Sequence, residues 1–171
     1  EFVVAYCDIN HFKPFNDAFG YGAGDEVILS LSRILCAAVD SRQDFVGHVG
    51  GDDFIVVFCS NDWQQRCETI LNEFSTVSIN LLSDVQMNYW SYDRQGHRQK
   101  FGPLTLAIGC VSPDVDACKT HHQVSQLLAD AKHSAKIQGG NQLFYSRRRA
   151  PPTTAGVDGT ACMLEQLGGD L

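Results

Sequence analysis

The chain contains at residues 48–58 the run His48-Val49-Gly50-Gly51-Asp52-Asp53-Phe54-Ile55-Val56-Val57-Phe58. Gly50 and Gly51 can adopt the positive φ angles that a two-residue hairpin turn needs. The apolar run that begins at Phe54 is typical of a buried strand. The pattern therefore predicts a β-hairpin whose turn places Asp52 and Asp53 at the mouth of a buried strand.

A further acid follows an apolar run near the start of the chain, Phe2-Val3-Val4-Ala5-Tyr6-Cys7, which ends at Asp8. An isolated Gly-Gly-Asp-Asp is more often an ordinary solvated turn than a site. Two neighbouring strands that each end in aspartate would bring carboxylate oxygens to one hard cation, which prefers oxygen ligands. Asp8 and Asp52 are therefore candidate metal ligands, and two acids that only cap turns are the alternative.

Three linked motifs carry a resemblance to a known family. They are Asp8-Ile9-Asn10-His11-Phe12-Lys13-Pro14-Phe15-Asn16-Asp17, then Gly20-Tyr21-Gly22-Ala23-Gly24-Asp25, then Gly50-Gly51-Asp52-Asp53-Phe54. In order and spacing they resemble the GGDEF domain family of diguanylate cyclases, with its patterns D-x-D-x-F-K-x-x-N-D, G-H-x-x-G-D and G-G-D/E-E-F. Residues 129–141 are a weaker match to the family's A-D-x-A-L-Y-x-A-K-x-x-G-R-N. The resemblance covers roughly residues 1–146.

The resemblance implies an α/β fold with a central mixed sheet flanked by helices, like the palm of nucleotidyl cyclases and polymerases. The residue pattern alone does not separate that fold from a flavodoxin-like one. The resemblance also implies a Mg²⁺ or Mn²⁺ ion held by Asp8, Asp52 and the backbone carbonyl of Ile9. The expected catalytic acids are Asp52 and Asp53, in a signature turn that includes Gly50, Gly51 and Phe54. The residues expected to bind the nucleotide are His11, Phe12, Lys13, Asn16, Asp25 and Lys136.

Asn16 and Asp25 match the positions that read guanine in this family. An amide and a carboxylate together can donate to O6 of guanine and accept from its N1–H and N2–H₂ groups. Read without the family, Asn16 is a helix-end residue and Asp25 an N-cap. The free N–H groups of a helix that begins near His11 can bind a polyphosphate. Lys13 and Lys136 can add positive charge there, although single lysines are more often solvated surface residues.

Departures from the family pattern bear on turnover. Asp53 stands where the family usually has glutamate, and a displacement of about 1 Å can cost on the order of a hundredfold in rate. His48 and Gly140 stand where the family usually has arginine, so two cations near the triphosphate are missing. The inhibitory R-x-x-D motif is absent too, because Ser41 occupies the arginine position before Asp44.

Two functions follow as alternatives. The favoured hypothesis is a GGDEF-type signalling domain of the cyclic di-GMP system that binds GTP or cyclic di-GMP in a divalent-metal cleft, with weak or lost cyclase turnover. The alternative is an active diguanylate cyclase that condenses two GTP molecules into cyclic di-GMP and pyrophosphate as a homodimer. A degenerate scaffold that only mediates dimerisation is a third interpretation.

Composition narrows the class of protein further. The 171 residues, 44% of them hydrophobic, suit one domain with a core. A net charge of −7 argues against a nucleic-acid binder or a membrane-surface protein. Seven cysteines without a C-x-x-C motif favour a reduced, cytoplasmic protein. Because the chain begins inside a predicted strand without an initiator methionine, we expect a fragment of a longer protein fused to other signalling domains.

Hydrophobic periodicity predicts the elements. Strands are expected at residues 2–7, 44–49, 54–59, 104–111 and 142–145, and helices at residues 12–19, 25–38 and 123–138, with another from residue 61 or 62 that carries apolar residues up to Phe74. We predict a turn at residues 20–24 and an inserted hairpin within residues 75–101, turning at residues 93–96. Residues 147–171, rich in Arg, Pro, Thr and Gly, are expected to be a disordered tail after a domain at residues 1–146.

Overall fold

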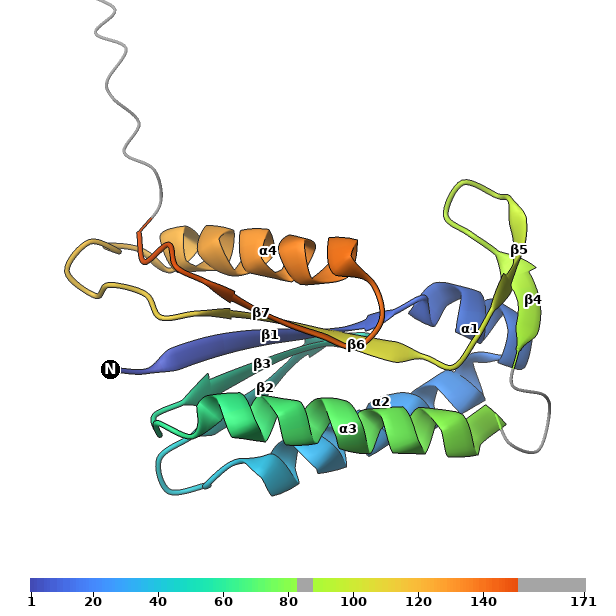
Figure 1. Ribbon diagram of the computed structural model, residues 1–171, viewed down its shortest axis with the longest axis horizontal. Helices are drawn as coiled ribbons and strands as arrows, with labels where there is room; N and C mark the ends of the chain where they lie inside the picture. Colours follow the sequence, from blue (N-terminus) through green and yellow to red (C-terminus); the bar gives the residue numbers. More distant parts are fainter. Residues whose placement is uncertain (83–87, 151–171) are drawn as a thin grey trace, which may run out of the picture.

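A five-stranded sheet forms the centre of the domain (Figure 1). The structure, a computed structural model, describes residues 1–82 and 88–150. The strands of this sheet are β1 (Val3–Asn10), β2 (Phe45–Gly50), β3 (Asp53–Phe58), β6 (Thr105–Val111) and β7 (Gln142–Ser146), in the order β2-β3-β1-β6-β7. β1 pairs antiparallel with β3 and with β6, whereas β6 and β7 are parallel. The sheet is therefore mixed, as predicted.

Helices cover both faces of this sheet (Figure 1). α2 (Tyr21–Ala38) and α3 (Trp63–Leu82) lie on one face, and α4 (His121–Gln138) lies on the other. α1 (Phe12–Phe19) follows β1 at one end of the sheet, beside a separate hairpin of β4 (Tyr89–Tyr92) and β5 (Arg98–Phe101). The predicted α/β architecture is confirmed.

The start of α2 differs from the prediction. The helix begins at Tyr21 rather than Asp25, so the predicted turn at residues 20–24 shrinks to Gly20, whose φ of 85° suits glycine. Glycines at 22 and 24 lower the helix propensity of this first turn, which is why the sequence pattern placed the helix later. Asp25 therefore lies inside the helix, and its alternative role as an N-cap is wrong.

The segment after Phe74 is only partly the predicted insertion. α3 continues to Leu82, which is fully buried, so the helix takes up the first part of the segment. The hairpin itself is confirmed by β4 and β5. Its turn is closed by the Asp93 carboxylate, which accepts hydrogen bonds from the N–H groups of Gln95 at 2.9 Å and His97 at 2.8 Å.

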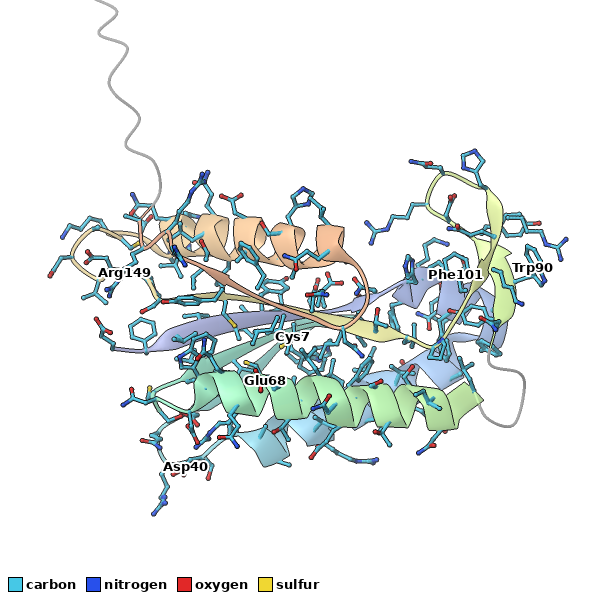
Figure 2. All side chains as sticks on the ribbon, in the orientation of Figure 1. Cys7, Asp40, Glu68, Trp90, Phe101 and Arg149 are labelled. Atoms are coloured by element: carbon cyan, nitrogen blue, oxygen red, sulfur yellow. The ribbon has the colours of Figure 1, made fainter. Side chains whose placement is uncertain are left out.

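The β4–β5 hairpin has an inner and an outer side. Phe101 is buried on the inner side, whereas the Trp90 side chain is 58% exposed and points away from the domain (Figure 2). Tyr89, on the inner side, packs edge to face on Phe15 and Phe19 of α1 at centroid distances of 6.1 and 4.9 Å. These aromatic contacts attach the hairpin to α1.

The main core lies between the sheet and the helices α2 and α3, and it contains three buried cysteines, Cys7, Cys67 and Cys110. Cys7 lies at the centre of the domain in Figure 2. Burial raises the pKa of the Cys7 thiol well above its ordinary value, and a hydrogen bond with Cys67 together with burial does so for Cys110. The six cysteines within the described residues are all free thiols.

Helix α4 lies close against the sheet at Gly109 of β6. A Cβ atom on Gly109 would lie 2.5 Å from the carbonyl carbon of Ala131 and 2.7 Å from Cα of Lys132. Both are backbone atoms, so a side chain at residue 109 would push the helix away from the sheet. Gly109 also pairs with Tyr6 of β1. Because residue 109 has no side chain, the α4 backbone at Lys132 can lie close to the sheet, next to β1.

The end of the described chain keeps defined contacts. The prediction of a disordered tail at residues 147–171 falls largely on residues 151–171, which lie outside the described residues. Arg149 accepts a hydrogen bond at its carbonyl from Asp114 N–H at 2.8 Å, and its guanidinium lies 3.2 Å from the Glu1 carboxylate. Within the described part of the chain, we find no helix with both the length and the apolar character needed to cross a bilayer.

Replacement of Gly109 by alanine tests the close approach of α4. We expect Gly109→Ala to lower the free energy of unfolding by about 1–3 kcal/mol, because the added methyl group overlaps helix backbone. Gly22→Ala is the matched control: a Cβ there meets nothing within 4 Å, and alanine in a helix should stabilise by about 0.5–1 kcal/mol. Urea unfolding followed by circular dichroism measures both, and a Gly109→Ala variant as stable as wild type would contradict the packing described.

Candidate functional site

A cavity of about 470 Å³ opens between α1, the β2–β3 turn and the tip of the β4–β5 hairpin. It brings together many of the residues predicted from the sequence: Ile9, His11, Phe12, Lys13, Asn16, Asp52 and Lys136. The hairpin adds Asp93, Arg94, Gln95 and Gln99 to the lining. Sequence analysis missed these hairpin residues, because no local pattern shows which way an inserted hairpin folds.

Other predicted residues lie outside the cavity wall. Asp25 is exposed in α2 and is not among the lining residues. Gly50 and Gly51 form the signature turn with φ angles of 149° and 56°, so their predicted positive φ is confirmed. Phe54 is buried in the core at the start of β3. The signature turn thus shapes the site through its backbone, while Asp52 is the turn residue that lines the cavity.

Asn16 lines the cavity and carries an unsatisfied acceptor. Its Oδ1 atom is buried and accepts no hydrogen bond from any described residue. Gly24 of α2 makes room for it, because a Cβ atom on Gly24 would overlap Oδ1 of Asn16. A buried acceptor without a donor costs free energy. Asn16 is therefore a residue of the cavity wall whose amide oxygen still lacks a donor.

The first turn of α1 also faces the cavity. His11 precedes the helix in the left-handed region, with φ of 60° and ψ of 26°, and its side chain does not cap the helix. Its ring instead lies 5.2 Å from that of Phe101. Burial lowers the pKa of His11, and the nearby charges of Lys136 and Arg94 lower it further. The uncapped N–H groups favour an anionic ligand at this helix end, whereas the neutral His11 ring adds no positive charge.

Beneath the cavity, two lysines of α4 converge on Asp8. The ammonium group of Lys132 lies 2.7 Å from Oδ2 of Asp8 and 2.8 Å from Oδ1 of Asp53. Lys136 contacts the other oxygen of Asp8, Oδ1. Sequence analysis missed Lys132, although a signal was present: it lies one helical turn before Lys136 and therefore on the same face of α4.

Asp8 and Asp52, two carboxylates of this site, have pKa values shifted in opposite directions. Burial alone would raise the pKa of Asp8, but hydrogen bonds from Lys132 and Lys136 hold it below its ordinary value. Burial likewise opposes the charge of Lys132, yet bonds to Asp53 and Asp8 raise its pKa. Burial raises the pKa of Asp52, and repulsion from Asp8 adds to the effect. The surroundings of Asp8 thus favour its anionic form, and those of Asp52 disfavour it.

The arrangement of these donors does not fit a divalent ion. Both oxygens of Asp8 already accept from ammonium groups. Within residues 1–82 and 88–150, no group of three or more His, Cys, Asp or Glu side chains is placed to hold a metal. A divalent ion at Asp8 would have to displace a lysine or lie beside one against charge repulsion. The predicted metal ligands Asp8, Ile9 and Asp52 stay a prediction that this geometry does not favour.

His48 and Asp44, which precede the signature turn, have structural roles. His48 Nε2 donates to the carbonyl of Gly51 at 2.8 Å, and its ring stacks on Phe54 at a centroid distance of 4.4 Å. Asp44 accepts from Cys59 N–H at 2.8 Å, and one of its oxygens lies 3.0 Å from the Arg66 guanidinium. Both side chains are therefore engaged in holding the hairpin rather than available for a ligand.

Comparison with known proteins identifies similar domains. The family model described as "Diguanylate cyclase, GGDEF domain" matches residues 1–142. The cyclic di-GMP phosphodiesterase PdeB of Shewanella oneidensis is 29% identical over 146 residues, which are 82% of this chain and 15% of that protein. A diguanylate cyclase of Vibrio cholerae is 44% identical over 50 residues, 29% of this chain and 15% of that protein. The chain thus spans about 15% of the length of these curated relatives.

Solved structures share the fold. Diguanylate cyclase SiaD of Pseudomonas aeruginosa, solved with its activator SiaC, superposes with a TM-score of 0.64 at 19% identity, covering 85% of this chain and 50% of that one. The GGDEF domain of DgcB from Caulobacter crescentus, solved with c-di-GMP, gives a TM-score of 0.55 at 20% identity, covering 84% and 77%. At this identity the likeness establishes the fold.

Neutralising Asp8 and Asp52 should have opposite effects on stability. The lowered pKa of Asp8 means that its contribution is present above the ordinary value of 3.8 and is lost as pH falls through the folded-state pKa. The raised pKa of Asp52 means that its ionisation disfavours the folded state once pH rises above 3.8. At neutral pH we expect Asp8→Asn to lower the free energy of unfolding by about 1–3 kcal/mol, and Asp52→Asn to raise it.

Urea unfolding at neutral and at acidic pH measures both effects, and each difference should shrink in acid. Asp116→Asn, at an exposed position, is the control and should change stability by less than about 0.5 kcal/mol. Equal losses in Asp8→Asn and Asp52→Asn would show that the two carboxylates are electrostatically alike.

Proposed function

The chain belongs to the GGDEF domain family of diguanylate cyclases, and we propose that it binds a guanine nucleotide, GTP or cyclic di-GMP, with cyclase turnover weak or lost. The observation that carries this proposal is the buried, unpartnered Oδ1 of Asn16 at the cavity wall. Guanine presents N–H donors at N1 and N2, which can satisfy this acceptor. Adenine has no donor at N1 or C2 and carries its amino group at C6, so a base that presents its N1–C2 edge to Asn16 must be guanine to satisfy this acceptor.

The charges around the cavity support binding of the phosphate groups. Lys136 and Arg94 line it, together with the uncapped first turn of α1 at Phe12 and Lys13. The Lys13 ammonium pairs with Asp17, and its side chain is 69% exposed, so we assign it a smaller part. The family usually has arginine at the position of Gly140, so one cation is missing there. Arg94 of the hairpin supplies another cation to the cavity wall.

The signature turn supports weak or lost turnover. Cyclisation requires attack of a ribose 3′-hydroxyl on an α-phosphate, and stabilisation of the charge that develops there. Asp53, the shortened acid, is held by Lys132 at 2.8 Å. His48, at the position of the family's arginine, hydrogen-bonds the Gly51 carbonyl. Both groups are thus engaged in contacts within the protein, which supports weak or lost turnover.

The curated relatives support a place in a longer signalling protein. PdeB, which matches most of this chain, is named a cyclic di-GMP phosphodiesterase, and the matched segment is 15% of it. A nucleotide-binding domain without turnover could regulate a catalytic domain in the same polypeptide. Fusion to such domains, a homodimer and the Mg²⁺ or Mn²⁺ ion stay predictions.

Replacement of Asn16 tests guanine recognition. We expect Asn16→Ala to weaken GTP binding by about tenfold or more, because one hydrogen bond to a buried acceptor is lost. Binding of ATP, measured in parallel by isothermal calorimetry, should not weaken. Asn72→Ala, on an exposed face of α3, is the matched control and should bind GTP like wild type. Equal affinity of wild type for GTP and ATP would refute the assignment of guanine.

A product assay separates the two functions. The domain is incubated with GTP and Mg²⁺ or Mn²⁺, and cyclic di-GMP and pyrophosphate are quantified. We expect GTP or cyclic di-GMP to bind while little or no product forms. Robust product that disappears in Asp52→Asn would instead establish an active cyclase.

A further inference from the structure

We propose that the ammonium group of Lys132 takes the place of a divalent cation between Asp8 and Asp53, so that the domain binds its nucleotide without a metal ion. That the domain binds a nucleotide rests on the proposed function. The position of the Lys132 cation is inferred from contacts within the protein. The contacts of Lys132 carry it.

The ammonium group of Lys132 has three neighbours that stabilise its charge. Two are carboxylates, at 2.7 Å from Asp8 and 2.8 Å from Asp53. The ammonium group also lies 4.3 Å from the ring centroid of Tyr6, in the geometry of a cation–π interaction. The Lys132 side chain is only 22% exposed. A lysine bound on three sides and largely shielded from water occupies its position stably.

The sheet itself requires a cation at this position. Asp8 and Asp53 lie directly opposite each other in the antiparallel β1–β3 ladder. Like charges in such a pair are destabilising unless something lies between them. A single divalent ion could bridge the two carboxylates, and here the Lys132 ammonium bridges them. The bridging position is therefore already filled by the polypeptide.

The charge count also disfavours an added divalent ion. Lys132 and Lys136 oppose the three carboxylates of Asp8, Asp52 and Asp53, which leaves one net negative charge. Mg²⁺ sites in proteins use one or two carboxylates together with substrate phosphates. Within the described residues, Asp52 is the carboxylate of the cluster that forms no ion pair, and a single carboxylate offers only a weak site.

Lys132 is held in place by the backbone as well as by its charge. Gly109 of β6 allows the α4 backbone at Lys132 to lie against β6, and the Lys132 side chain then reaches over Tyr6 of the neighbouring strand β1. In the family pattern quoted above, the residue four positions before the phosphate lysine is leucine, and here that position is Lys132. The chain thus adds a cation where the pattern has an apolar residue.

Two measurements on the wild-type domain test the proposal. First, GTP is titrated by calorimetry in EDTA and in excess Mg²⁺, and we expect affinities that agree within about threefold. Secondly, Mn²⁺ is titrated into the protein without nucleotide and followed by electron paramagnetic resonance, and we expect no loss of the free-ion signal. GTP binding that requires Mg²⁺, or Mn²⁺ binding by the wild-type protein, would overturn the proposal.

Lys132→Met completes the test. Removing the charge exposes Asp8 and Asp53 to an ion, so this variant should bind Mn²⁺, and a further Asp8→Asn replacement should abolish that binding. Its GTP affinity in EDTA should fall by about tenfold or more and recover with Mg²⁺. Lys132→Arg keeps the charge and should behave like wild type, as should Lys119→Met, which alters an exposed lysine outside the cluster.

The outcomes separate this proposal from the proposed function. If GTP binds under none of these conditions, nucleotide binding is refuted, and the Mn²⁺ titrations still decide the cation position. A folded Lys132→Met variant that binds no Mn²⁺ would overturn the proposal, because Lys132 would then not be what excludes the ion. If that variant does not fold, Lys132→Met combined with Asp53→Asn restores the charge balance, and the wild-type titrations remain decisive.

Discussion

Three carboxylates crowd at the ends of β1 and β3, and this concentration of negative charge is what the rest of the site is built to neutralise. Asp8 and Asp53 face each other across the ladder, and Asp52 lies in the adjoining turn. The lysines that neutralise them come from α4, far along the chain. The contact of α4 with Gly109 therefore has an electrostatic as well as a packing role, since it brings Lys132 within hydrogen-bonding distance of the strands.

The parts of the fold that rest on local patterns could be predicted from the sequence. Gly50 and Gly51 indicate the hairpin turn by their conformational freedom, and alternating or continuous apolar runs indicate the strands. The start of α2 was wrong because glycines weaken the helical pattern of its first turn. α3 was predicted too short because residues 75–79, Ser-Thr-Val-Ser-Ile, have lower helix propensities than the residues before them. Asp25, expected beside the nucleotide, lies outside the cavity wall.

The candidate site was predictable only where a motif places residues together. Asn16, Asp52 and Lys136 are joined by the cavity as the resemblance implies. Arg94 could not be foreseen, because the orientation of the hairpin depends on aromatic contacts between distant segments. Lys132 required knowing how close α4 lies to β1. His48 and Asp44 precede the signature turn. Their side chains form hydrogen bonds to backbone groups of the hairpin and of the residue that follows it, and they do not line the cavity.

The three core thiols have a practical consequence. Cys7, Cys67 and Cys110 come from β1, α3 and β6, so they become accessible together only when the layer between the sheet and the helices opens. Cys36 and Cys59 are exposed in the native state. An alkylating reagent would therefore label those two quickly and the buried three at the rate of global opening. The chain carries its own chemical reporter of unfolding, which mass spectrometry can read without an added probe.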